Sequence, residues 1–259
     1  MTHVIGHRGA PLAETENTVA AFRAAAAQGA DGVELDVRRT ADGELAVHHD
    51  AHLADGRAIV GVSWADMPDG VPDIDTALDA CRDLAVVNVE IKNWPDDVDF
   101  DPSLAAVDRI VEALLARPAG ERDRLLVSCF HLPSLDRVRE RAPELATAWL
   151  VIGPVEAAGH PWGAPAGDPV AAMVAEAAAH GHRALHPHHA FVSPRLVAEA
   201  HEAGVVVNAW TCDDPERIRW LAEVGIDAVI TNVPDVALAA LRRVPSAAPP
   251  GEEVSHRGL

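Results

Sequence analysis

Short apolar runs alternate with longer segments of helical period along almost the whole chain, and this alternation narrows the possible folds more than any other feature. Eight runs have the length of β-strands, at residues 3–6, 32–37, 84–91, 125–129, 146–152, 183–186, 205–210 and 228–231. Eight segments have helical periodicity, at residues 17–28, 74–82, 102–117, 133–141, 169–180, 194–203, 215–223 and 234–242. Because helices alternate with strands in this way, the strands are expected to pair in parallel.

Two α/β architectures share this local pattern: a closed (β/α)8 barrel, or TIM barrel, and an open doubly wound sheet. The apolar runs are nearly continuous, as expected of strands covered on both faces in either fold. Polar residues gather at the C-terminal ends of the runs, where barrel enzymes keep their chemistry. We therefore predict a single (β/α)8 barrel domain over residues 1–244, followed by a disordered Pro-rich tail at 245–259.

One connection is much longer than the others. Residues 38–73 separate the second strand from its helix, and a loop of this length is uncommon without a function. Residues 40–48 contain an Asp42-Gly43 pair, and such a pair between two strand-like stretches is a strong signal for a β-hairpin. We expect a short insertion that contains this hairpin and covers part of the barrel mouth.

The overall charge limits the classes of partner. A formal charge of -19 argues against nucleic acid and against an anionic membrane surface. It leaves room for a small anionic substrate, because a metal ion or an arginine inverts the field locally. No run of about 18 apolar residues and no secretory signal is visible. The chain is expected to be cytoplasmic, without a stable membrane anchor, and a homo-oligomer remains open.

Two carboxylates alternate along the second strand and a third lies on the next strand. Glu34 and Asp36 are two residues apart and share one strand face, and Glu90 repeats the pattern. Carboxylates inside a barrel are costly unless they are paired or bind a cation, and Mg²⁺ and Ca²⁺ prefer such oxygen ligands. The alternatives are a solvated face or a salt bridge. Lys92, the only lysine of the chain, shares the face of Glu90.

Two histidines are expected in loops at the same end of the barrel. His7 and Arg8 follow the first strand, and His49 follows the hairpin. Two imidazoles on separate loops suit general acid and general base roles on opposite sides of a phosphorus atom, and arginine binds phosphate oxygens bidentately. His48 should point away from His49 and is given no role. Trp210, at the end of the seventh strand, either packs against a glycerol-like group or covers the barrel end.

Taken together, these motifs resemble the glycerophosphodiester phosphodiesterase family. The resemblance covers about residues 3–242, and its main stretches are His7-Arg8-Gly9-Ala10, Glu16-Asn17-Thr18, Glu34-Leu35-Asp36-Val37, His49-Asp50, Glu90-Ile91-Lys92, Trp210-Thr211 and Thr231-Asn232-Val233-Pro234. It implies a (β/α)8 barrel, one divalent metal ion (Mg²⁺ or Ca²⁺), and hydrolysis of a small glycerophosphodiester to glycerol 3-phosphate and an alcohol.

The resemblance also implies roles for individual residues. It implies metal ligands at Glu34, Asp36 and Glu90, an acid–base pair at His7 and His49, and substrate contacts at Arg8, Lys92, Asn17 and Trp210. The attacking hydroxyl is either water or the substrate's own glycerol hydroxyl. The sequence departs from the family pattern after His49-Asp50, at residues 71–75 and after Trp210. The first two departures lie in the insertion that caps the site, and they leave the identity of the alcohol open.

Two other functions remain compatible with the sequence. A phospholipase-like phosphodiesterase that acts on intact lipids would share the barrel and the paired histidines, but the acidic charge speaks against membrane docking. A barrel that binds phosphodiesters without turnover would share the fold, but two histidines and three carboxylates favour an enzyme.

Overall fold

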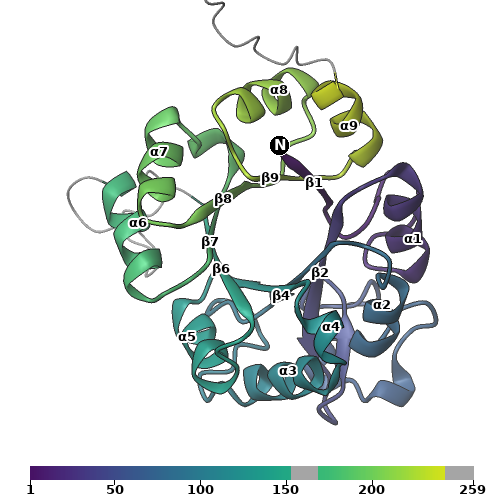
Figure 1. Ribbon diagram of the computed structural model, residues 1–259. Helices are drawn as coiled ribbons and strands as arrows, with labels where there is room; N and C mark the ends of the chain where they lie inside the picture. Colours follow the sequence, from purple (N-terminus) through teal and green to yellow (C-terminus); the bar gives the residue numbers. More distant parts are fainter. Residues whose placement is uncertain (153–168, 243–259) are drawn as a thin grey trace, which may run out of the picture.

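The computed structural model describes residues 1–152 and 169–242, so the expected tail at 245–259 lies outside the described residues. Eight parallel strands form a closed barrel, because β1 pairs with both β9 and β2 (Figure 1). These strands are β1 (His3–Gly6), β2 (Gly32–Arg39), β4 (Val86–Ile91), β5 (Leu125–Cys129), β6 (Ala146–Val151), β7 (Ala184–Pro187), β8 (Val206–Ala209) and β9 (Ala228–Thr231). The predicted (β/α)8 barrel is confirmed.

Helices surround the barrel on its outside (Figure 1). They are α1 (Val19–Gln28), α2 (Ile74–Ala80), α3 (Ala105–Ala116), α4 (Ala119–Arg122), α5 (Leu132–Arg141), α6 (Pro169–Ala179), α7 (Pro194–Glu202), α8 (Pro215–Glu223) and α9 (Pro234–Arg242). Within the described part of the chain, none of these helices is long and apolar enough to cross a membrane. Cytoplasmic location and homo-oligomer formation stay predictions.

The outer faces of the strands build the main hydrophobic core. On β2, Val33, Leu35 and Val37 are almost fully buried in the cluster that joins the strands to the helices. Because successive side chains of a strand point to opposite faces, this packing directs Glu34 and Asp36 into the barrel. The apolar face thus fixes where the carboxylates point.

Two helices begin two or three residues later than expected. The helix expected from residue 17 begins at Val19, because Thr18 accepts a hydrogen bond from the backbone N–H of Ala21 at 3.2 Å. The helix expected from residue 102 begins at Ala105, after Leu104, whose backbone is left-handed (φ 62°) and whose side chain makes no capping hydrogen bond. Ahead of it, Asp101 accepts from the backbone N–H of Ala106 at 2.8 Å. Residues 17 and 102 therefore stay in the loops that precede the helices.

The long connection after β2 contains the expected hairpin. Strand β3 (Leu45–Val47) pairs antiparallel with the end of β2, and Val37 lies opposite Val47. Gly43 takes a left-handed conformation (φ 84°) in the turn. The rest of the insertion has a small core of its own, made by Ala46, Leu53, Ile59 and Val62. A folded insertion of this kind holds the residues after β3 beside the C-terminal end of β2.

Candidate active site

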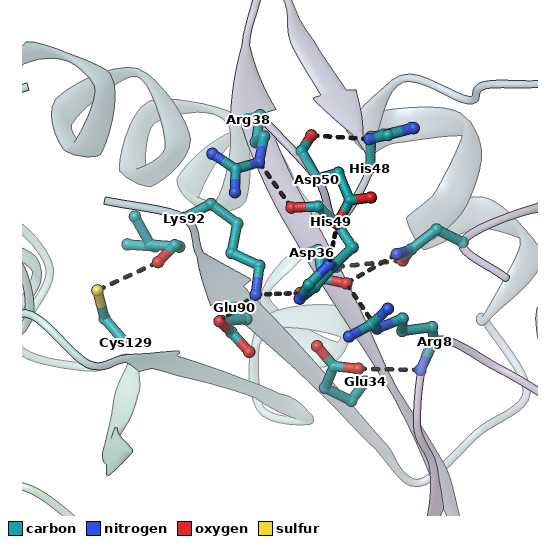
Figure 2. Close-up of polar contacts among 12 residues, drawn as sticks. Arg8, Glu34, Asp36, Arg38, His48, His49, Asp50, Glu90, Lys92 and Cys129 are labelled. Carbon is teal, nitrogen blue, oxygen red and sulfur yellow. Dashed lines mark hydrogen bonds and ion pairs between the residues drawn. The ribbon is translucent and has the colours of Figure 1, made fainter. Parts of the chain in front are cut away.

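Three buried carboxylates meet near the C-terminal ends of β2 and β4 (Figure 2). Glu34 and Asp36 come from β2 and Glu90 from β4, and Asp36 lies opposite Glu90 in the strand register. One oxygen of each carboxylate lies within 4.8 Å of the others, and all three residues are buried. The structure thus brings together the three residues that the sequence suggested as metal ligands.

The carboxylate group fits a divalent cation. Burial, together with the charges of Asp36 and Glu90, raises the pKa of Glu34 well above its usual range. The Oε1 atom of Glu34 is buried and has no hydrogen-bond partner among the described residues. A buried acceptor of this kind is costly unless a cation or a donor meets it. These hard oxygen donors are the ligands that Mg²⁺ and Ca²⁺ prefer.

Two cationic side chains already contact the carboxylates. The Nζ atom of Lys92 lies 2.6 Å from Oε1 of Glu90 and 2.9 Å from Oδ1 of Asp36. The Nε atom of Arg8 lies 3.3 Å from Oδ2 of Asp36. Burial alone would raise the pKa of Asp36, but Lys92, His49 and Arg8 lower it below its usual range. When all three carboxylates are ionised, they exceed these two cations by one negative charge, which a bound metal ion would neutralise.

The loop after β1 is held in an unusual backbone conformation. Arg8 and Asn17 both have positive φ angles, of 54° and 57°, which are uncommon for residues other than glycine. The loop closes through a hydrogen bond from the backbone N–H of Asn17 to the carbonyl of Arg8 at 3.0 Å. The amide of Asn17 then donates to Oδ2 of Asp36 at 2.7 Å. This contact explains why Asn17 lies outside α1.

A glycine allows this loop to approach the first helix. Gly9 has a φ of 91°, and a Cβ there would lie 2.6 Å from the backbone carbon of Ala21. Any larger residue would therefore displace the loop. The backbone N–H of Arg8, next to it, donates to Oε2 of Glu34 at 2.9 Å. The glycine thus helps to place the Arg8 backbone on a site carboxylate.

Each of the two expected histidines is fixed through its Nδ1 atom. In His7 this atom lies 2.8 Å from Oδ1 of Asn232, and in His49 it lies 2.7 Å from Oδ1 of Asp50. Both partner atoms accept hydrogen bonds, so Nε2 is left as the free base of each neutral ring. Burial is the main reason why the pKa of each imidazole is lowered. Both rings lie close enough to Asp36 for its negative charge to raise the pKa of each imidazole, against the larger effect of burial.

A cavity of about 230 Å³ opens beside the carboxylates. Its lining includes His49, Glu90, Lys92 and the aromatic ring of Phe130. Trp210 packs against Phe130 with 5.5 Å between the ring centroids. Trp210 thus supports Phe130 in the wall of the cavity, and its direct contact with the substrate stays a prediction.

The family model for the glycerophosphoryl diester phosphodiesterase family matches residues 7–236 of the chain. The chain belongs to this family. As a member of it, the chain is a phosphodiester hydrolase. The glycerophosphodiester phosphodiesterase of Caldanaerobacter subterraneus is 29% identical and aligns over 93% of this chain and 98% of its own length. The enzyme of the same name from Bacillus altitudinis is 26% identical over 92% of this chain and 97% of its own.

Solved structures of the family share the fold. Glycerophosphodiester phosphodiesterase from Thermotoga maritima superimposes with a TM-score of 0.73 and 26% identity, over 94% of this chain and 99% of that one. A phosphodiesterase from Oleispira antarctica, solved in complex with the product sn-glycerol-3-phosphate, has a TM-score of 0.79 and 24% identity, over 93% of this chain and 97% of that one. The (β/α)8 barrel of this chain is therefore the fold that these solved structures share.

Sequence reasoning missed Arg38, which holds one of the histidines of this family member. The Nε atom of Arg38 donates to the backbone carbonyl of His49 at 2.7 Å. Its Nη1 atom donates to both oxygens of Asp99, at 2.7 and 2.8 Å, and its Nη2 atom donates to Asp97 at 2.8 Å. The guanidinium group is buried, so it is a positioning residue. One signal was available: Arg38 continues the alternation of Glu34 and Asp36 on β2.

Sequence reasoning also missed the support behind His7. The backbone N–H of Asn232 donates to Oδ1 of Asp213 at 2.8 Å, and its amide donates to Oδ2 at 2.7 Å. Because Asp213 uses the amide nitrogen, the amide oxygen of Asn232 must face Nδ1 of His7. The stretch Thr231-Asn232-Val233-Pro234 matches the family pattern, but no sequence pattern predicts that Asn232 pairs with Asp213.

Proposed function

We propose that the chain hydrolyses small glycerophosphodiesters to glycerol 3-phosphate and an alcohol. The observation that carries this proposal is the meeting of three buried carboxylates, two histidines and two cations at one end of the barrel. The product found in the Oleispira antarctica relative, sn-glycerol-3-phosphate, supports the same class of product here. The reaction needs a cation to accept negative charge and groups that move protons, and this end of the barrel offers both.

We further propose that Glu34, Asp36 and Glu90 hold one divalent cation, Mg²⁺ or Ca²⁺. The unpartnered Oε1 atom of Glu34 and the mutual repulsion of the three carboxylates support this assignment. When bound, such a cation polarises phosphoryl oxygens and lowers the pKa of a hydroxyl. Asn17 contributes by holding Asp36 in place through its amide.

His7 and His49 are proposed as the acid–base pair. With Nδ1 of each ring held by Asn232 or Asp50, each Nε2 atom is available to hold or release a proton. One ring removes the proton from the attacking hydroxyl, and the other, once protonated, donates to the oxygen of the leaving alcohol. Arg38 fixes the backbone of His49, so that this ring does not need to be ordered when the substrate binds.

Arg8 and Lys92 are proposed to contact the phosphate. Their side chains are cations in contact with site carboxylates, and each has further N–H groups with which to meet phosphate oxygens. Phe130 lines the cavity together with Lys92, and Trp210 packs against Phe130. We propose that this aromatic side receives the carbon skeleton of the substrate.

The proposed function is tested with a panel of substrates, each assayed with and without Mg²⁺ or Ca²⁺. The panel holds glycerophosphocholine, glycerophosphoethanolamine, glycerophosphoglycerol and an intact phosphatidylcholine, and the readout is enzymatic detection of glycerol 3-phosphate. We expect metal-dependent release from at least one water-soluble diester and none from the intact lipid. Faster cleavage of the lipid would favour a phospholipase-like enzyme. Binding of the diesters without any product would favour a non-catalytic barrel.

The single lysine of the chain gives a sharper prediction. The Nζ atom of Lys92 bridges Glu90 and Asp36 at 2.6 and 2.9 Å, and its side chain is only 11% exposed. A guanidinium group is planar and wider, and it directs its donors differently, so it does not fit this bridging position. Lys92→Arg is therefore expected to lose most of its kcat/KM although the charge is kept, as measured on the best diester of the panel.

A matched control is the reverse exchange at an exposed basic residue. Arg242 is the last residue of α9 and is exposed, so Arg242→Lys should leave kcat/KM unchanged. If Lys92→Arg were equally unimpaired, Lys92 would have to be removed from the proposed site.

A further inference from the structure

A second group of potential metal ligands lies outside the barrel, among the helices. Asp136 belongs to α5, whereas His180 and His182 lie between the end of α6 and the start of β7. One ligand atom of each lies within 4.8 Å of the others. Thr147, which contacts His182, is the second residue of β6. The group therefore lies toward the N-terminal ends of the strands, away from the active-site carboxylates (Figure 1 shows α5, α6, β6 and β7).

The imidazole of His182 leaves one buried ring nitrogen unused. Its side chain is 0% exposed, and its Nδ1 atom lies 3.0 Å from Oγ1 of Thr147. Its Nε2 atom has no hydrogen-bond partner among the described residues and lies 3.8 Å from Oδ1 of Asp136, too far for a hydrogen bond. Buried polar atoms nearly always have a partner. The free Nε2 atom therefore points to a ligand between His182 and Asp136.

His180 is arranged in a complementary way. Its Nδ1 atom lies 2.7 Å from the same Oδ1 atom of Asp136, and its Nε2 atom lies 3.3 Å from Oε1 of Glu176. Histidines that bind a metal usually donate their other ring N–H to a carboxylate or another acceptor. Glu176 is placed to accept from His180 in this way, and the Thr147 hydroxyl is placed to accept from His182.

The spacing and the charge both suit a small dication. Zn²⁺ binds nitrogen and carboxylate ligands at about 2.0–2.2 Å, so neighbouring tetrahedral ligands are about 3.4 Å apart. The separations from Oδ1 of Asp136 to the two rings, 2.7 and 3.8 Å, lie on either side of this value. Asp136 and Glu176 supply two negative charges, against the guanidinium of Arg139 nearby. One proton between Asp136 and His180 would be displaced when the metal binds.

We propose that Asp136, His180 and His182 form a zinc site that is separate from the active site and stabilises the fold. Two imidazole nitrogens and one carboxylate select Zn²⁺ or a similar transition-metal ion over Mg²⁺ and Ca²⁺. The all-carboxylate set of the active site has the opposite preference. The bound ion ties α5 to the connection between α6 and β7, and water completes its coordination.

The test is equilibrium dialysis of the full-length chain against Zn²⁺, followed by metal analysis. Glu34→Gln serves as the background, because it removes a carboxylate from the active site and leaves the second group intact. This background is expected to bind one zinc ion per chain, and Zn²⁺ should raise its Tm. Adding Asp136→Asn or His180→Ala should weaken zinc binding at least about 10-fold and remove the rise in Tm.

His201 provides a matched control. Its Nε2 atom lies 2.9 Å from Oδ2 of Asp227, so it forms a histidine–carboxylate pair on the surface like that of His180. His201→Ala in the same background should leave zinc binding unchanged. The proposal is overturned if the Glu34→Gln background binds no zinc, if Asp136→Asn and His180→Ala bind it as tightly as the background, or if His201→Ala weakens binding equally. Both site residues are partly exposed, so their variants are expected to fold.

Discussion

Removal of divalent cations is expected to abolish the hydrolysis of glycerophosphodiesters, and Mg²⁺ or Ca²⁺ is expected to restore it. Without a cation, Glu34, Asp36 and Glu90 would repel the negative phosphate of the substrate, and Lys92 and Arg8 would offset part of this repulsion. The measurement is the release of glycerol 3-phosphate after exhaustive treatment with EDTA and again after back-titration with each metal. Full activity after chelation would contradict the metal assignment.

A variant at Glu34 separates catalysis from stability. Glu34→Gln keeps the shape of the side chain, and an amide oxygen still accepts from the backbone N–H of Arg8, the contact that Oε2 makes at 2.9 Å. The variant removes a buried carboxylate whose pKa is raised by burial and by the charges of Asp36 and Glu90. Without metal, its Tm should equal or exceed that of the wild type. Its activity should fall, because metal affinity should drop by more than about 100-fold, beyond the usual loss for an outer partner.

Thermal unfolding in the presence of metal provides the second readout for this variant. A metal at about 100 times its Kd should stabilise the wild type by about 2.7 kcal/mol, which corresponds to a rise in Tm of roughly 5–10 °C for a domain of this size. Glu34→Gln should lose this rise. Glu16→Gln, which removes an exposed carboxylate paired with Arg8 at 2.9 Å, should keep it. A lost rise in the Glu16 variant would point to general loss of negative charge instead of a specific ligand.

The barrel was predictable because its strands carry two signals at once. On β2 the alternation of Val33, Leu35 and Val37 with Glu34 and Asp36 defines an outer apolar face and an inner polar face. One strand therefore indicates both the fold and the site. Its neighbour β4 repeats the signal at Glu90, and the register of parallel strands then brings the two sets of carboxylates together.

The parts that were not predicted depend on partners that are distant in the sequence. Arg38 and Asp99 are 61 residues apart. No local sequence pattern predicts that the buried guanidinium group of Arg38 pairs with the carboxylate of Asp99. The start of α1 depends on the capping side chain of Thr18 and the start of α3 on the left-handed backbone of Leu104, and periodicity resolves neither. The group at Asp136 and His182 was missed for the same reason, since its members come from different elements.

The loss of either site histidine is expected to have the other large effect on catalysis. His7→Ala and His49→Ala should each lower kcat by about 10²–10⁴-fold, the usual contribution of a positioned general acid or base. Each substitution removes the ring whose Nδ1 atom is held by Asn232 or Asp50, and with it the free Nε2 atom, while Asn232 and Asp50 remain. Steady-state kinetics on the best diester of the substrate panel measures the loss, and circular dichroism checks that the barrel is intact.

His48 provides a control one residue away from His49. Its Nδ1 atom lies 2.9 Å from the backbone carbonyl of Asp50, whereas His49 contacts the Asp50 carboxylate (Figure 2). Because the two histidines use different atoms of Asp50, His48→Ala leaves the carboxylate in place for His49, and kcat should stay close to that of the wild type. If the large loss followed His48 instead of His49, the hairpin would present the other face to the substrate, and His49 would have to be withdrawn as the acid or base.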